Sequence, residues 1–182
     1  MIYLMRHGQT DWNVLRKIQG RTDIALNERG RQMAKEARTK YADISFDVCY
    51  CSPLVRAKET AEIFLEGRDT PVIFDDRLME MSFGICEGEE HVLENPSSPL
   101  YPLFTDPAHY TAVEDAESLD ELFARSGAFI DEMLLPAASK GQNVLIVSHG
   151  AVGCSIICRL KQIERSDFWS VLCKNCELVR IL

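Results

Sequence analysis

The sequence predicts an α/β fold in which helices cover both faces of a mostly parallel sheet, giving a three-layer α/β/α sandwich. Two observations support this class. Short apolar runs alternate with segments of helical periodicity along nearly the whole chain. In addition, 46% of the 182 residues are hydrophobic, enough for a sizeable core. The length favours one compact domain over 1–182 rather than two.

Five apolar runs are the expected strands. They are short, and turn-forming or helical segments separate them, as is typical of strands joined by helical crossovers. They comprise 2–5, 47–51, 71–74, 143–148 and, closing the chain, 177–182.

Four segments have helical signals. The pattern predicts a helix over 53–66, with Ser52 as cap and Pro53 at the first helical position. A second helix should follow Asn27, with its buried side formed by Met33, Ala34, Ala37 and Tyr41. A third should begin at Ser118, which forms a capping box with Glu121. The fourth is expected over 151–160.

Residues 88–116 interrupt this alternation. Four of the seven prolines fall here, among several aromatic residues. A long connection with little regular structure is usually a functional lid or disordered, and the aromatic residues favour a lid or insertion. We expect the two histidines in it, His91 and His109, to be exposed loop residues.

The charge balance excludes some classes of partner. The net charge is −8 and there is no run of Lys and Arg, so a role on nucleic acid or an anionic membrane has no electrostatic basis. No apolar run reaches the length of a membrane span, and no basic start precedes an apolar leader segment. We therefore expect a cytoplasmic protein, with its oligomeric state left open.

Seven cysteines suit buried, reduced thiols better than a disulfide framework, because their number is odd and several lie in apolar runs. The alternative is a four-thiolate zinc site built from Cys154, Cys158, Cys173 and Cys176. Its flanking segments are as apolar as core, which favours the first interpretation. Trp12 and Trp169 are likewise expected to be packing residues.

One short internal repeat, an apolar run followed by His-Gly, indicates a site. The runs 1–8 and 143–150 both read as a buried strand ending in His-Gly, so His7 and His149 should emerge together at the carboxyl edge of the sheet. Ligands of parallel sheets bind at that edge. Glycine after each histidine allows a tight turn and close approach of a ligand to the backbone.

Three more side chains should reach the same edge. Arg6 precedes His7, and Arg56 lies in the first turn of helix 53–66, so their planar guanidinium groups could grip phosphoryl oxygens together. Glu80 follows the strand over 71–74 closely. The alternative without a function is that Arg56 is a solvated charge on its helix and Glu80 an exposed carboxylate in a loop.

With these residues assembled, the sequence resembles the histidine phosphatase superfamily, also called the phosphoglycerate mutase-like family. The matching blocks occur in the family's order and cover nearly the whole chain outside 88–116. They are RHGQTDWN at 6–13, QGRTDIALNERG at 19–30, SPLVRAKETA at 52–61, LMEMSFGICEG at 78–88 and VLIVSHG at 144–150.

The resemblance implies a phosphoglycerate mutase-like fold and a phosphatase acting on a small phosphomonoester. His7 would be the nucleophile and form a phosphohistidine, Glu80 would be the proton donor, and Arg6, Arg56 and His149 would surround the phosphoryl oxygens. The remaining substrate-binding positions would be Thr10, Asn13, Gln19, Gly20 and Gly150. No metal or cofactor is implied, because the arginines supply the positive charge, and a phosphate or sulfate ion would fit the same pocket.

Two positions depart from the family's pattern. Cys86 stands where members often carry Trp, and Ala116 replaces the Gly of a common Gly-Glu-Ser stretch. Neither change removes a chemical group from the site, so both bear on the substrate more than on the reaction.

Other functions stay open at this stage. The same catalytic residues also support mutases. Family members of that kind look longer and have more elaborate insertions over the site, so the single short lid of this chain favours hydrolysis. A non-catalytic phosphate-binding protein would be expected to lack His7, Arg6 or Glu80. A two-histidine metallohydrolase is disfavoured, because no metal-binding histidine motif is present. The identity of the phosphomonoester is not specified by any pattern.

Overall fold

The computed structural model describes all 182 residues. A central sheet of five strands has the order β3-β2-β4-β1-β5. Four strands are mutually parallel, and β5 pairs antiparallel with β1. They are β1 (Ile2–Arg6), β2 (Val48–Cys51), β3 (Val72–Phe74), β4 (Val144–Ser148) and β5 (Leu178–Arg180). The predicted fold class is confirmed, although the closing strand is shorter than 177–182.

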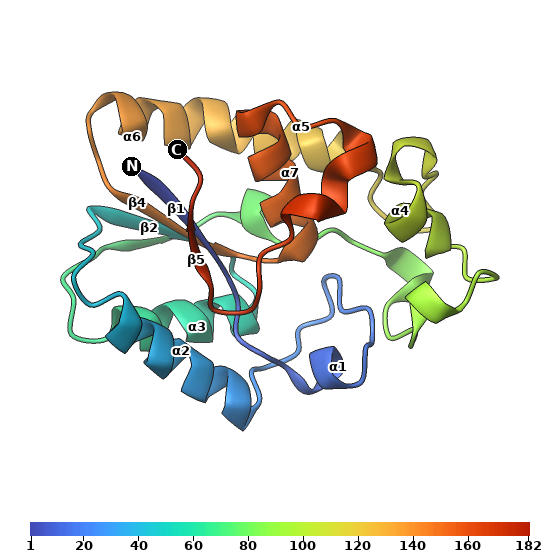
Figure 1. Cartoon of the computed structure of the whole chain (residues 1–182), viewed down its shortest axis with the longest axis horizontal. Coiled ribbons are helices and arrows are strands. Elements are labelled where there is room, and N and C mark those ends of the chain that lie inside the picture. Colours follow the sequence, from blue (N-terminus) through green and yellow to red (C-terminus); the bar gives the residue numbers. More distant parts are fainter.

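Helices cover both faces of the sheet, as Figure 1 shows. On one face lie α2 (Glu28–Lys40) and α3 (Val55–Leu65), which contact each other. The other face carries α5 (Leu119–Phe129), α6 (Leu135–Ser139) and α7 (Gly150–Lys161). Two short helices, α1 (Asp11–Val14) and α4 (Tyr101–Thr105), lie toward the end of the molecule where β1 and β4 finish (Figure 1).

Successive side chains along each strand point to opposite faces of the sheet, so the hydrophobic core is divided into two clusters. Ile2 and Leu4 pack into the larger cluster with α5 and α7, whereas Tyr3 and Met5 pack into the smaller cluster with α2 and α3. Each central strand therefore has hydrophobic side chains on both faces, as a covered parallel sheet requires. The edge strand β3 is the exception, since its side chains are exposed.

Side-chain caps mark the starts of α1, α2 and α5. Asn27 accepts a hydrogen bond from the Gly30 N–H at the start of α2, and Ser118 forms the predicted capping box with Glu121. The prediction of a helix over 53–66 is wrong at its start. Leu54 is extended and α3 begins at Val55, while Ser52 accepts the Leu54 N–H from outside the helix.

The long helical segment after Ser118 continues beyond α5. A single π-helical turn at Ile130–Leu134 connects it to α6. Proline has no N–H to donate, so Pro136 at the start of α6 is accommodated where the hydrogen-bond pattern has just shifted.

The segment 88–116 contains α4 and two 3₁₀ turns, Val92–Glu94 and Pro107–His109. His91 and His109 have side chains 54% and 83% exposed, which confirms that they are surface histidines. None of the helices is both long and apolar enough to cross a membrane.

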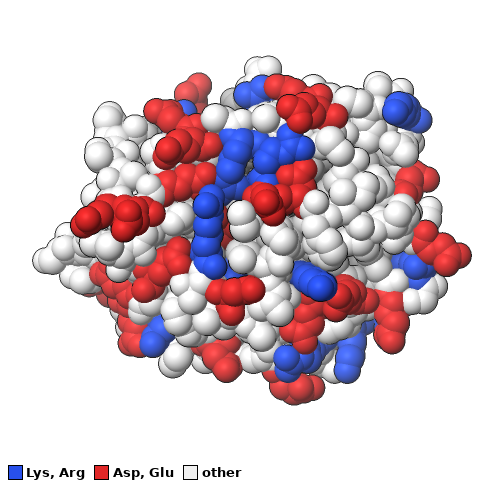
Figure 2. Space-filling model, turned by 180° about the vertical axis from the view of Figure 1, so that it is seen from behind, with Lys and Arg blue, Asp and Glu red and all other residues white.

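Charged residues are mixed over the surface. Seen from behind, Lys and Arg gather in one short band near the middle of that face, with Asp and Glu beside it (Figure 2). This face therefore presents no broad basic surface.

Candidate active site

The two central strands place both histidines at one edge of the sheet. β1 and β4 pair in register from Ile2 with Val144 to Arg6 with Ser148, so the next residues, His7 and His149, leave the sheet side by side. The two imidazole centroids are 5.1 Å apart, and both rings are almost fully buried. The two His-Gly repeats of the sequence therefore lie at the ends of two neighbouring strands.

His7 is oriented by its own turn. Its Nδ1 lies 2.7 Å from the Gly8 carbonyl oxygen, which can only accept, so Nδ1 carries the proton and Nε2 keeps its lone pair. Burial, together with the positive charges of Arg56 and Arg6, lowers the pKa of His7 well below its ordinary value. The imidazole is therefore neutral at neutral pH, the form needed for a nucleophile.

The backbone around His7 is fixed on both sides. The Gly8 N–H donates to Thr60 Oγ1 at 2.9 Å, and the Asn175 side chain donates to the His7 carbonyl at 2.7 Å. A Cβ on Gly8 would lie 2.7 Å from the carbonyl oxygen of Gly30 in α2. Only glycine fits between this turn and the helix.

His149 lies behind His7 and does not line the cleft. Its Nδ1 accepts a hydrogen bond from Arg56 Nε at 3.2 Å, so its proton is on Nε2, which donates to Ser52 Oγ at 2.7 Å. Burial and the neighbouring Arg56 lower its pKa well below the usual value. Ser52, which the sequence suggested only as a helix cap, therefore also orients this ring.

Two arginines bring positive charge into the cleft. Arg56 is fully buried in the first turn of α3, where its Nη2 donates to the Gly20 carbonyl at 2.6 Å and its Nη1 to the Thr22 carbonyl at 3.0 Å. Arg6 donates to the Cys173 carbonyl at 3.3 Å, and its Nε is buried without a partner. Burial lowers the pKa of both groups.

Neither arginine has a carboxylate within ion-pair distance. Glu80 is the nearest acidic influence on both, and it faces two buried cations, so the cleft favours binding of a further anion. This is the clearest electrostatic feature of the molecule.

Glu80 lies across the cleft at the N-terminus of α7. Its carboxylate accepts from the N–H groups of Met81, Ala151 and Val152 at 2.9–3.2 Å. The side chain is 9% exposed and lines the cleft. A carboxyl group is thereby held at a fixed position facing the same space as His7 and the arginines.

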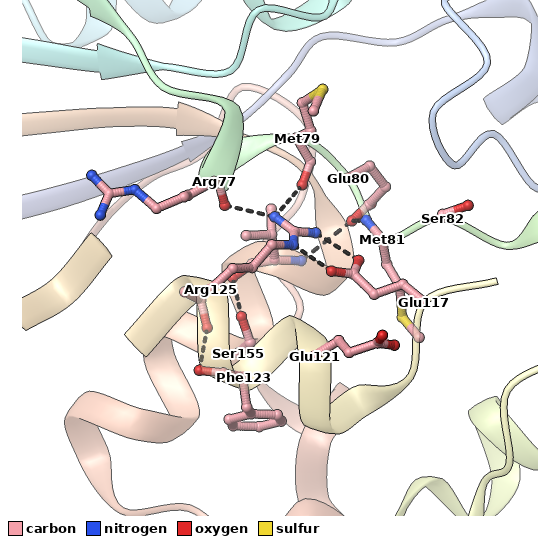
Figure 3. A network of polar contacts seen from close by, with 12 residues as sticks. Arg77, Met79, Glu80, Met81, Ser82, Glu117, Glu121, Phe123, Arg125 and Ser155 are labelled. Carbon is pink, nitrogen blue, oxygen red and sulfur yellow. Dashed lines mark hydrogen bonds and ion pairs between the residues drawn. The ribbon is translucent and has the colours of Figure 1, made fainter. Parts of the chain in front are cut away.

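A buried ion pair supports the segment that carries Glu80, as Figure 3 shows. Arg125 of α5 donates Nη1 to the carbonyl oxygens of Arg77 and Met79, at 2.6 and 2.8 Å. Its other nitrogens bind both oxygens of Glu117, at 2.5 and 2.8 Å. Sequence analysis missed this support, because nothing in the local pattern links residues 77–79 to Arg125.

The other predicted binding positions divide into two groups. Asn13, Gln19, Gly20 and Gly150 line the cleft, whereas Thr10 is fully buried outside its lining. Thr10 caps α1 and donates to Gln19 Oε1 at 3.0 Å. It therefore lies behind the residues that line the cleft.

The cleft has a volume of about 360 Å³ and an outer wall that sequence analysis did not identify. That wall contains Ile18, Phe83, Leu93, Phe104, Trp169 and Leu172. Leu93 and Phe104 come from the insertion over 88–116. Trp169 was expected to be a packing residue only. It stacks on Phe104, but it also faces the cleft. Apolar periodicity cannot distinguish a core residue from a cleft residue, so only Phe104, one of the aromatic residues that favoured a lid over 88–116, had a sequence signal.

The two departures from the family's pattern are accommodated locally. Ala116 has no left-handed conformation; the preceding residue, Asp115, has it instead, with φ of 59°. Cys86 is buried beside the cleft wall, and burial raises the pKa of its thiol.

The zinc alternative is wrong. No group of three or more His, Cys, Asp or Glu side chains is arranged to hold a metal. Cys154, Cys158 and Cys173 pack in the larger core cluster, whereas Cys176 belongs to the cluster on the other face of the sheet. All seven thiols are buried and unpaired, and burial raises the pKa of Cys49 and Cys176 to about 12.

The cleft of this α/β sandwich brings together a neutral histidine, two arginines without an ion-paired carboxylate and a carboxyl group, an arrangement suited to phosphoryl transfer. The chain matches the Histidine phosphatase superfamily (branch 1) over residues 2–182, and it belongs to that family. The enzyme is a phosphatase.

Individual relatives agree with this assignment. The chain is 37% identical over 153 residues to an uncharacterized phosphatase, PhoE, of Bacillus subtilis, covering 82% of this chain and 72% of PhoE. It is 31% identical over 176 residues to phosphoserine phosphatase 1 of Hydrogenobacter thermophilus, covering 96% and 82%. The solved structure of Bacillus stearothermophilus YhfR superposes with a TM-score of 0.87 at 30% identity, covering 97% and 88%.

Proposed function

We propose that this phosphatase hydrolyses a small phosphomonoester through a phosphohistidine on His7. The observation that carries the proposal is the unprotonated Nε2 of a buried, neutral His7 next to two arginines without carboxylate partners. Relatives named as phosphatases of small phosphorylated compounds, such as phosphoserine phosphatase 1, support the substrate class.

In the first step, His7 Nε2 attacks phosphorus and the bond between phosphorus and the ester oxygen breaks. Arg6 and Arg56 stabilise the charge on the phosphoryl oxygens, which is the main requirement of phosphoryl transfer. The protonated carboxyl of Glu80 donates its proton to the departing oxygen, so the leaving group departs as an alcohol.

In the second step, water attacks the phosphohistidine while the carboxylate of Glu80 takes one of its protons. The bond between nitrogen and phosphorus breaks, and the electron pair returns to His7 Nε2. Phosphate leaves, and both groups regain their starting protonation states. His149 acts through Arg56 in this scheme, because its ring bonds that side chain and is screened from the cleft.

We further propose that 1–182 acts as a single domain and that the insertion over 88–116 is a lid. Leu93 and Phe104 reach from it into the cleft lining, which supports this role. The lid would then contact the alcohol part of the substrate, while the sheet edge binds the phosphoryl group.

The test is alkaline-quench trapping of the phosphoenzyme from a labelled phosphomonoester, because phosphohistidine survives in base and hydrolyses in acid, combined with phosphate release in the presence of chelator. We expect acid-labile phosphate on the wild type and none on His7→Ala, with turnover reduced by at least about 10³-fold. His109→Ala, which removes an exposed histidine outside the cleft, is the control and should match the wild type. Equal labelling of both variants would refute His7 as the nucleophile.

A further inference from the structure

The outer half of the cleft is lined by hydrocarbon from four separate segments of the chain. Phe104 and Trp169 stack with ring centroids 5.0 Å apart and an interplanar angle of 22°, which forms a broad aromatic surface. Leu93 and Leu172 are 62% and 43% exposed, although they line a cleft. A ligand in the cleft would remove this hydrocarbon from water.

Two polar side chains of the cleft lining, those of Trp169 and Lys17, already have partners. Trp169 donates its indole N–H to the Leu103 carbonyl at 2.7 Å. Lys17, the outer cation, is paired with Glu90 at 3.1 Å and lies 5.7 Å from the centre of the Trp12 ring. A polar group of the substrate that packs against Phe104 and Trp169 would therefore lose water without gaining a hydrogen bond from the indole.

The apolar wall begins next to the reacting groups. A Cβ built on Gly150 would lie 3.2 Å from Leu172 Cδ1 and 3.5 Å from Glu80 Oε2, so the leucine and the proton donor flank the same point. The first carbons of a leaving alcohol that receives its proton from Glu80 would lie close to Leu172, with Arg6 Cζ 3.8 Å from the same point on the phosphoryl side.

We propose that the enzyme selects phosphomonoesters of apolar alcohols, whose alkyl or aromatic group packs against Phe104, Trp169, Leu93 and Leu172. This rests on the phosphatase function proposed above and specifies its substrate class. Zwitterionic and polyol esters, such as phosphoserine and glycerol phosphate, are disfavoured because their polar groups would lose water against this hydrocarbon surface.

The experiment compares kcat/KM for hexyl phosphate and ethyl phosphate, with phosphoserine and glycerol 3-phosphate as polar substrates. The two alkyl esters have leaving alcohols of similar reactivity, so their ratio reports packing. Each buried methylene is worth about fourfold, and we expect hexyl phosphate to exceed ethyl phosphate by at least about tenfold. Both polar esters should fall below hexyl phosphate.

Single substitutions test which residues of the cleft wall cause the preference for hexyl phosphate. Leu172→Gln and Leu93→Gln should each lower the ratio of hexyl to ethyl phosphate by at least about threefold, because each replaces apolar contact with an amide. Leu135→Gln is the matched control, since Leu135 is 45% exposed but lies on α6 outside the cleft lining. It should leave the ratio unchanged.

A second readout separates this proposal from the phosphatase mechanism. Hexylphosphonate and ethylphosphonate, which cannot be hydrolysed, are titrated calorimetrically into the wild type, and the hexyl compound should bind at least about tenfold more tightly. Tight hexylphosphonate binding without turnover of any ester would overturn the mechanism but support the apolar subsite. Turnover with equal rates for the two alkyl esters, or a preference for phosphoserine, would overturn the subsite and leave the mechanism standing.

Discussion

At the scale of single residues, the site depends on side chains held in energetically unfavourable states. His7 and His149 are neutral because they are buried beside two arginines, and that environment lowers both pKa values. In the unfolded chain the same groups titrate near pH 6.5. Because the pKa values of these histidines differ between the folded and unfolded chain, the environment that keeps His7 neutral also makes the stability of the fold depend on pH.

The sign of this linkage follows from proton counts. Between the low folded pKa and the unfolded value near 6.5, the unfolded chain binds more protons, so stability falls as pH decreases through this window. From pH 7 to 5.5 each histidine should remove about 1.2 kcal/mol of unfolding free energy, or about 2.5 kcal/mol for the pair. Urea unfolding at both pH values measures this change.

The matched variants are His7→Gln and His109→Gln. His7→Gln should lose about half of the pH-dependent decrease, whereas His109→Gln removes a surface histidine and should retain it. Identical pH dependence in wild type and His7→Gln would show that His7 is not held neutral by the fold.

Glu80 allows a second prediction at this scale. Glu80→Gln retains an oxygen that can accept from the α7 N-terminus but cannot donate a carboxyl proton. Hydrolysis of ethyl phosphate should slow by about 10²–10⁴-fold, because ethoxide is a poor leaving group. Nitrophenyl phosphate should slow much less, since nitrophenolate leaves without a proton. Equal slowing in steady-state assays of the two esters would remove Glu80 from the acid role.

At the scale of elements, the site depends on contacts between segments distant in sequence. Arg125 on α5 binds the carbonyls of residues 77 and 79, and Glu117 neutralises it (Figure 3). This pair connects the start of α5 to the segment that presents Glu80. We interpret Arg125 as a positioning residue, because it acts on Glu80 through the backbone and not on substrate.

Arg125→Met should destabilise the fold by about 1–3 kcal/mol, because it leaves the buried Glu117 carboxylate with only the longer contact to Arg21 at 3.6 Å. Below the unfolding transition, kcat should fall by at least about tenfold while phosphate affinity is retained, since Arg6 and Arg56 are untouched. Arg165→Met, which breaks the exposed pair with Asp120, should cost less than about 1 kcal/mol and leave kcat unchanged. A loss of phosphate binding in Arg125→Met would argue against a role confined to Glu80.

The sequence predicts the presence of helices and strands better than the residues at which they begin and end. The paired His-Gly strands were recognisable because equal strand ends in a parallel sheet must lie side by side, and the Ser118 capping box marks the start of α5. The start of α3 was wrong by two residues because Ser52 bonds His149, a contact made only after folding. The apolar cleft wall was invisible for the same reason, since its members come from distant segments.

At the scale of the whole molecule, the fold gathers two arginines in one cleft without placing a carboxylate within ion-pair distance of either, although the chain carries a net charge of −8. Inorganic phosphate supplies the missing charge, so it should stabilise the folded state by mass action. At 100 times its dissociation constant the gain is about 2.7 kcal/mol, which raises Tm by roughly 5–10 °C for a chain of this size. Thermal unfolding with phosphate, against chloride of equal ionic strength, measures the effect.

Arg6→Met tests whether the uncompensated charge is the cause. Arg6 makes one side-chain hydrogen bond and leaves its Nε unsatisfied, so replacing it with an apolar side chain removes a buried cation at little structural loss. In phosphate-free buffer its Tm should match or exceed that of the wild type, and most of the rise with phosphate should disappear. Arg16→Met, which removes an arginine with a side chain 66% exposed, should keep the full rise. A lower Tm without phosphate, together with an undiminished response to it, would mean that Arg6 stabilises the fold and does not bind the anion.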